Sequence, residues 1–179
     1  MTVQKQKSSF TLFGKQAVLL VMLVFTYVHS AHAQQAKTAR IALGFKTDEY
    51  IQLTADTAKL AKALRRTLAD GTVIYNVSII SQSGNHYLVG QGIKMYHKKI
   101  IAVEIEYDIA NRTFYAVDHV PHYTCSAAAC EDCELFLESG KIIGCHCPEM
   151  QTVSNQCTYK HTDISTFFSH LSQFIRVRH

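Results

Sequence analysis

The stretch that decides the fold reads VIYNVSIISQSGNHYLVGQGIKMYHKKIIAVEIEY and covers residues 73–107. Apolar and polar residues alternate on both sides of the turn cluster SQSGNH, as they do in half-buried strands. The pattern predicts four sequential strands joined by short turns, at residues 73–79, 86–95, 101–107 and 113–117. Such strands form an antiparallel meander with one packed face and one solvated face.

Two amphipathic segments flank these strands. In residues 53–69 the leucines recur at helical spacing, and Asp70-Gly71 follows as a stop signal. In residues 164–175 an aromatic and aliphatic stripe has the same spacing. The expected fold class is therefore α+β, with an N-terminal amphipathic helix packed on a four-stranded antiparallel meander, a cysteine-rich hairpin excursion and a C-terminal helix.

The N-terminus has the features of an export signal. Three lysines precede an uncharged apolar run at residues 17–28, and small residues lead up to Ala33. This order predicts a signal peptide at residues 1–33. The apolar run is shorter than the roughly 20 residues of a membrane-spanning helix, so no stable membrane anchor is expected after cleavage. The remaining residues 34–179 are predicted to form one α+β domain, exported to a periplasm or to the extracellular space.

Composition and charge narrow the class of protein. With 179 residues, 47% hydrophobic and 18% charged, the chain is an ordinary globular protein. The formal charge of +4 includes the three leader lysines, so the mature part is left with a charge near +1. A nearly neutral domain predicts no nucleic-acid partner, because such binding depends on clustered basic residues.

All six cysteines lie in a cysteine-rich excursion, which we define as residues 119–161. They are Cys125, Cys130, Cys133, Cys145, Cys147 and Cys157. Within the excursion, ELFLE and KII flank Ser139-Gly140, which predicts a hairpin. A turn centred there places Cys133 opposite His146 and beside both Cys145 and Cys147.

The leading interpretation of the cysteines is a set of disulfides. Six cysteines in an exported protein predict three bridges, and neither the count nor the spacing fixes the pairing. Because Cys145 and Cys147 are separated by one residue, the expected set joins them to Cys130 and Cys133. Cys125 and Cys157 then form the outer bridge. Each bridge would stabilise the fold by about 2–4 kcal/mol, and no cofactor is needed.

The alternative is a zinc site. Cys130-x2-Cys133 and Cys145-x-Cys147 could supply four thiolates, although the second spacing is tighter than usual. Further possible ligands are the four histidines of the excursion, three of which could join Cys125 or Cys157 in another site. These histidines are His119, His122, His146 and His161. An oxidising compartment opposes this reading, because it converts neighbouring thiols to disulfides.

One local resemblance concerns the segment VPHYTCSAAACEDC, residues 120–133. Its C-x4-C-x2-C spacing resembles the cluster loop of plant-type ferredoxins, with Cys157 in the place of the distant fourth ligand. The resemblance implies an iron–sulfur cluster. It covers this loop alone and leaves Cys145 and Cys147 without a role.

Catalytic motifs are absent from the sequence, and no catalytic residue is predicted. Glu104, Glu106 and Asp108 share one face of an expected strand, where a solvated surface is the ordinary explanation. The acidic residues inside Cys130-x2-Cys133 oppose thiolate formation, which disfavours a redox enzyme. The predicted function is an exported, non-enzymatic binding or structural module with a disulfide-stapled loop and an unidentified ligand or partner. The alternative is an exported metal-binding protein.

Overall fold

A computed structural model describes residues 39–130, 132–148 and 156–175 of the chain. Strands account for 53% of these residues and helices for 14%. The domain is therefore mostly β, built on three sheets, and the expected α+β class is wrong. The predicted signal peptide, residues 1–33, lies outside the described part of the chain. None of the helices within that part is long and apolar enough to cross a membrane.

The central element is a five-stranded antiparallel sheet with the order β11-β8-β5-β4-β3. Its strands are β3 (Val73–Gln82), β4 (Asn85–Lys94), β5 (His97–Glu104), β8 (His122–Ala127) and β11 (Cys157–Thr162). The first three strands form the predicted meander. The other two come from the cysteine-rich excursion, which is thus part of the main sheet.

A second sheet has the order β2-β1-β7-β6. Its strands are β1 (Arg40–Lys46), β2 (Ile51–Leu53), β6 (Glu106–Asp108) and β7 (Thr113–Val117). The chain leaves the first sheet at Ile105, whose N–H donates to the His86 carbonyl at 3.0 Å. The fourth strand predicted for the meander therefore belongs to a different sheet.

The third sheet is the hairpin of β9 (Glu134–Glu138) and β10 (Lys141–His146). Its turn lies at Ser139 and Gly140, as predicted, and both residues have positive φ values of 50° and 79°. A Cβ on Gly140 would overlap the Gln82 carbonyl oxygen. Glycine is therefore required here both by the backbone conformation and by the close approach of the β3–β4 turn.

Two helices are shorter than the sequence pattern suggests. Helix α2 (Thr57–Leu68) begins where Asp56 Oδ1 accepts from the N–H of Ala58 at 2.9 Å. It cannot begin at Leu53, because that residue ends β2. Helix α3 (Phe167–Ser172) has six residues, and Ile164, expected on its apolar stripe, is exposed.

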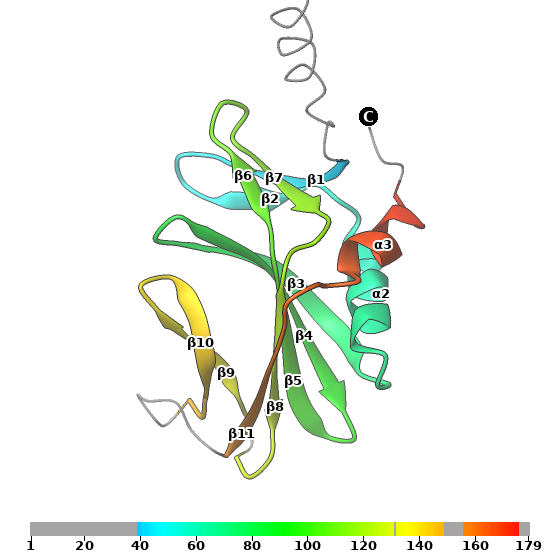
Figure 1. Ribbon diagram of the computed structural model, residues 1–179, viewed down its shortest axis with the longest axis vertical. Coiled ribbons are helices and arrows are strands. Elements are labelled where there is room, and N and C mark those ends of the chain that lie inside the picture. The colour runs from blue at the N-terminus through cyan, green and yellow to red at the C-terminus, as the bar shows by residue number, and fades with distance from the viewer. Residues whose placement is uncertain (1–38, 131, 149–155, 176–179) are drawn as a thin grey trace, which may run out of the picture. The chain divides into compact units, whose positions relative to one another are not determined.

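The five-stranded sheet separates two hydrophobic cores (Figure 1). On one face α2, α3 and the second sheet cover apolar residues that include Leu88, Ile101 and Val103. On the other face the β9–β10 hairpin covers Tyr87, Val89, Ile100 and Ala102. The residues alternate between the two cores along β4 and β5, as the period of a strand requires. Below, the two sides are called the helix face and the hairpin face.

Candidate functional site

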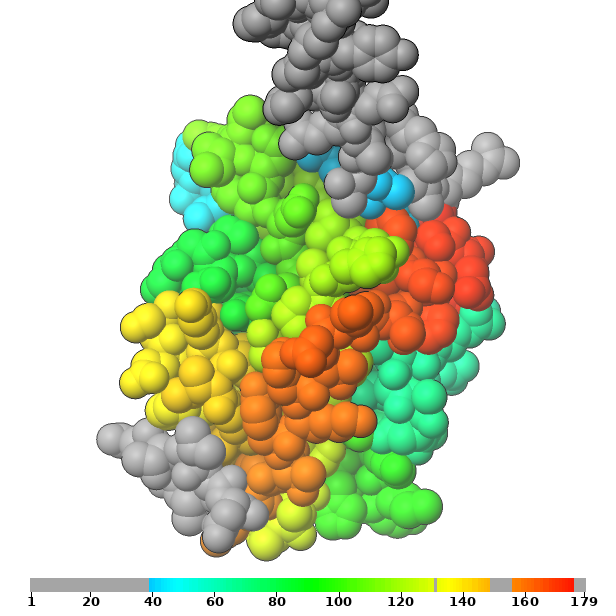
Figure 2. Space-filling view, in the orientation of Figure 1, coloured from blue at the N-terminus to red at the C-terminus, as the bar shows by residue number. Residues whose placement is uncertain are grey.

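Strand β8 brings the first cysteine to the hairpin face of the sheet. It pairs with β5 on one side and β11 on the other, so that Cys125 stands opposite Ile100 and Tyr159. The side chain of Cys125 is fully buried. The hairpin covers it, and the surface of that hairpin runs alongside β11 (Figure 2, yellow and orange).

The hairpin register differs by one residue from the predicted one. Next to the turn, Leu137 pairs with Ile142 as expected, but the register shifts between Ile142 and Gly144. Beyond this bulge His146 pairs with Glu134, whereas the simple hairpin placed it opposite Cys133. A bulge inserts one unpaired residue into one strand and re-aims the side chains that follow it.

Three disulfides join this layer to the sheet. The bridges are Cys125–Cys145, Cys130–Cys147 and Cys133–Cys157. The first connects β8 to β10, the third connects the base of β9 to β11, and the second closes the loop between them. The prediction of three bridges is confirmed.

The predicted pairing is only partly correct. Cys130 does bond to Cys147, but the expected Cys125–Cys157 bridge is absent. The register of β8 and β11 explains this, because Cys157 stands opposite Ala127, two positions from Cys125. Cys125 instead faces the overlying β10.

Four sulfurs form a compact group, which we call the four-sulfur cluster: Cys130, Cys133, Cys147 and Cys157. Between the two bridges, Cys130 Sγ lies 3.5 Å from Cys157 Sγ and 3.6 Å from Cys133 Sγ. Cys147 Sγ lies 4.0 Å from Cys157 Sγ. Cys130 is half-buried and the other three are buried.

This grouping differs from both metal-ligand sets expected from spacing. Cys145 is bonded to Cys125, and its Sγ lies 3.8 Å from the Thr124 carbonyl oxygen, inside the layer. Among the described residues, the group of metal-type ligands within reach of one another is Cys130, Cys147 and Cys157. The sequence did not indicate that Cys157 belongs with Cys147, because β11 was not predicted.

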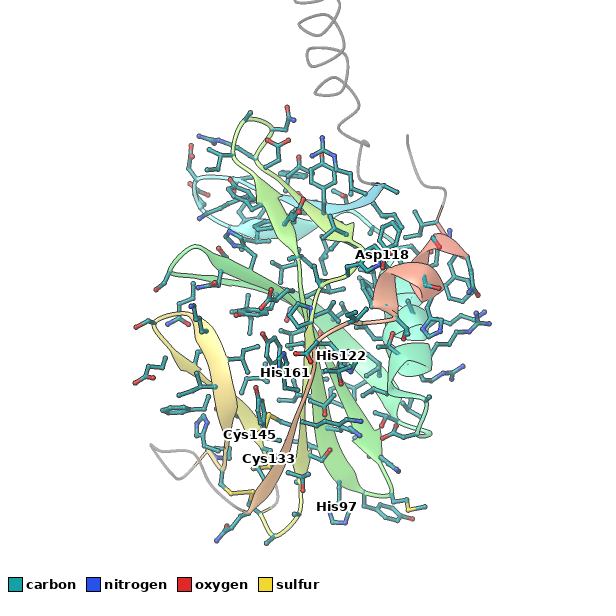
Figure 3. The ribbon with its side chains drawn as sticks, viewed as in Figure 1. His97, Asp118, His122, Cys133, Cys145 and His161 are labelled. Atoms are coloured by element: carbon teal, nitrogen blue, oxygen red, sulfur yellow. A yellow bond between two sulfur atoms is a disulfide. The ribbon has the colours of Figure 1, made fainter. Side chains whose placement is uncertain are left out.

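The four histidines lie apart from this group within the described structure. His119 is exposed, and its Nδ1 lies 3.4 Å from Asp118. His146 Nε2 lies 3.7 Å from Glu134 Oε2. His122 and His161 sit on neighbouring strands (Figure 3), but His161 pairs with Tyr123, so the two rings point to opposite faces. Burial, followed by the charges of Lys160 and His161, lowers the pKa of His122.

A tyrosine cluster occupies the hairpin face beside the bridges. The Tyr123 hydroxyl donates to Glu104 Oε1 at 2.8 Å, and its ring stacks on His161 at 4.9 Å and contacts Tyr87 edge-on. Burial and then the hydrogen bond to Glu104 raise the pKa of Tyr123. Tyr123 therefore stays protonated at neutral pH, and its role here is that of a donor which fixes the core.

A recess of about 780 Å³ opens between the β3–β4 turn and β6. It is lined by both cationic and acidic side chains, among them Arg40, Lys46, Glu106 and Asp108. Inside it, His86 Nδ1 lies 2.9 Å from Ser81 Oγ. The two residues are paired across β3 and β4. The sequence gives no sign of this contact, because the cluster SQSGNH predicts a turn that begins at Ser81.

The three acidic residues predicted to share a strand face are divided by the structure. Glu104 ends β5 and bonds to Tyr123. Glu106 and Asp108 lie on β6, where Asp108 is 3.6 Å from Arg40. The change of sheet at Ile105 separates them, so they do not form a joint cation site.

Comparison with protein-family models, with curated proteins and with solved structures finds no significant match. The function of this chain is therefore inferred from its own residues and contacts.

Proposed function

We propose that the protein is an exported, non-enzymatic binding or structural module whose hairpin layer is held by three disulfides. The observation that carries the proposal is the bonding of all six cysteines, which join the hairpin to β8 and β11. Structural disulfides are characteristic of oxidising compartments. The predicted leader at residues 1–33 supports the same location.

The polar recess supports the binding version of this proposal. A polar ligand in it would meet both basic and acidic side chains, and His86 lies at its wall. The ring of His86 packs at 5.2 Å from Tyr107 and 5.4 Å from Phe114. These contacts and the cross-strand partner Ser81 account for its position, which favours a structural role over catalysis. The near-neutral charge of the mature chain argues against nucleic acid as the ligand.

The test is to locate the protein and to map its bridges. Cell fractionation should place the mature chain outside the cytoplasm. Its oxidised form should weigh about 6 Da less than the reduced form. Proteolysis without reduction should yield the three cross-linked pairs described above. Six free thiols in the protein taken from its native compartment would contradict the proposal.

The second candidate is metal binding, favoured by the four-sulfur cluster. Thiolates select zinc and related soft metals. Zinc is preferred to an iron–sulfur cluster, because opening the two bridges of the four-sulfur cluster frees four neighbouring thiols. The ferredoxin-like set also requires Cys125, whose bridge to Cys145 is fully buried. Elemental analysis of protein purified without added metal tests this candidate. Less than about a tenth of an equivalent of zinc, iron or copper argues against a resident metal.

A further inference from the structure

The contacts between the sulfurs of two different bridges suggest a second state of the cluster. The separations of 3.5, 3.6 and 4.0 Å link Cys130 to Cys157, Cys130 to Cys133, and Cys147 to Cys157. A zinc–thiolate bond of about 2.3 Å implies about 3.8 Å between neighbouring sulfurs of a tetrahedral site. Three of the six edges of such a tetrahedron therefore already have nearly the right length.

We propose that reduction of the Cys130–Cys147 and Cys133–Cys157 bridges converts the four-sulfur cluster into a tetrathiolate site that binds one zinc ion. The site is thus closed to metal in the oxidised protein and opened by reductant. This inference extends the metal-binding candidate. It also rests on the bridge pairs of the proposed function, which can be correct even if the reduced protein binds no metal.

The reductant required is a dithiol. Its thiolate attacks Sγ of Cys130, which is the half-buried residue of the cluster, and Cys147 leaves as a thiolate. The second thiol of the reductant then displaces Cys130 and forms the reductant's own disulfide. Each bridge opened in this way takes up two electrons and two protons. Zinc binding to the four thiols releases four protons.

Cys130 also provides a route to the second, buried bridge. Once free, its thiolate lies 3.6 Å from Cys133 Sγ. Attack there forms a Cys130–Cys133 bond and releases Cys157 as a thiolate. A second dithiol reduces that new bond by attack at Cys130, the half-buried residue. Two dithiols therefore open two bridges and leave four thiols.

The third bridge holds the layer in place during this change. Cys125 and Cys145 are 0% and 1% exposed, so a reductant reaches them last. Their bridge ties β10 to β8, and the pairing of β8 with β11 is independent of any sulfur. The elements that carry the four thiols therefore stay together after two bridges are open.

The formal charges around this position balance. A small hollow of about 100 Å³ beside Cys133 is lined by Lys98 and Lys99 and also by Asp132 and Glu134. The carboxylate of Asp132, which lies between two of the ligands in sequence, forms an ion pair with Lys98 at 2.5 Å. The proposal therefore rests on the positions of the four sulfurs.

The experiment titrates the full mature protein with cobalt chloride as a spectroscopic substitute for zinc, before and after limited reduction with dithiothreitol. The oxidised protein should bind no cobalt. After release of four thiols it should bind one equivalent, with thiolate-to-cobalt absorption that zinc chloride abolishes. Cys133→Ser/Cys157→Ser should reduce the bound cobalt at least tenfold. The control, His119→Ala, removes an exposed metal-type ligand outside the four-sulfur cluster and should retain the bound cobalt.

A footprint on the wild-type protein covers the case in which a variant does not fold. Alkylation of the reduced protein followed by peptide mass mapping should show zinc protection of Cys130, Cys133, Cys147 and Cys157. Cys125 and Cys145 should still be cross-linked. The inference is overturned if the protein with four free thiols takes up no cobalt. It is also overturned if zinc protects cysteines other than the four of the cluster. In either case the disulfide map of the oxidised protein stands on its own.

Discussion

The helix face of the five-stranded sheet is covered by two helices and a second sheet, whereas the hairpin face is covered by one two-stranded hairpin. The first cover contributes large buried side chains such as Leu64, Phe114 and Phe167, and no cysteine. The second contributes Leu135, Ile142 and four of the six cysteines from the hairpin and its flanks. A small layer buries too little apolar surface to hold itself against a sheet, and covalent bonds replace the missing contacts.

Truncation of a core side chain on the helix face should give the largest effect. Phe114 is fully buried between the two sheets. Phe114→Ala should lower the free energy of unfolding by about 3–5 kcal/mol, because it leaves a cavity that the surrounding sheets cannot close. Urea denaturation measures this. The matched control is Phe136→Ala on the hairpin, a partly exposed ring that packs on His146. An equal loss of unfolding free energy in the two variants would mean that the helix face does not depend more on buried side chains than the hairpin face.

Removal of one bridge should affect the hairpin face selectively. Cys125→Ala/Cys145→Ala opens a link between residues 20 positions apart and should cost about 3 kcal/mol. The amides of β9 and β10 should then exchange with solvent faster than those of β3 and β4, because the hairpin loses its attachment first. Hydrogen exchange measured by NMR compares the amides of the hairpin with those of β3 and β4. Uniform acceleration across all strands would show that the hairpin face is not a separate unit.

Acid should weaken the helix face through Asp70. Burial alone would raise the pKa of this carboxyl, but hydrogen bonds from Lys99 and Thr72 lower it below its ordinary value. The folded protein therefore binds its proton less readily than the unfolded chain. The contribution of Asp70 is fully present above about pH 5 and is lost as the pH falls below about 4.

The variant Asp70→Asn should cost about 1–2 kcal/mol at pH 7 and should flatten the loss of stability in acid. Thermal denaturation at pH 3–7 checks both effects. The control is Asp163→Asn, at an exposed carboxylate 3.6 Å from His161. An unchanged acid profile in Asp70→Asn would assign the pH dependence to other groups.

A comparison of two glycines separates steric contact from backbone strain at the hairpin tip. Gly84 and Gly140 have the same φ of 79°, but a Cβ at Gly84 meets open space while one at Gly140 meets Gln82. Gly84→Ala should cost about 1 kcal/mol from backbone conformation alone. Gly140→Ala should cost about 1–2 kcal/mol more, because the tip must move away from the sheet. Equal losses in chemical denaturation would mean that the tip does not depend on this contact.

Local patterns of the sequence predicted individual elements well. Alternation located β3 and β4, and Ser139-Gly140 located the hairpin turn. The alternation of apolar and polar residues could not show the division into two sheets. It runs unbroken through Ile101, Val103 and Ile105, although the chain passes there from the five-stranded sheet to the second sheet. Alternation reports which face a side chain occupies, and carries no information about the neighbouring strand.

The presence of disulfides at the cysteine site could be predicted from the sequence, but their pairing could not. An even count of cysteines indicated bridges, but the pairing depends on the bulge before Gly144 and on strand β8. The β8 sequence HYTCSA is buried at nearly every position and lacks both the alternation and the apolar run of a recognisable strand. Once β8 and β11 are placed in the sheet, the position of Cys125 beneath β10 follows.

The order of the bonded cysteines along the chain governs how the protein can be made. Cys125, Cys130 and Cys133 all precede Cys145, and each bonds to a cysteine at or beyond that position. A chain that enters an oxidising compartment from its N-terminus exposes three thiols whose partners are still absent, and two of them are only three residues apart. Bonds formed early among these three are wrong and have to be reopened by thiol exchange. In such a compartment the correct bridges would form only after Cys145, Cys147 and Cys157 had entered, later than the strands of the meander.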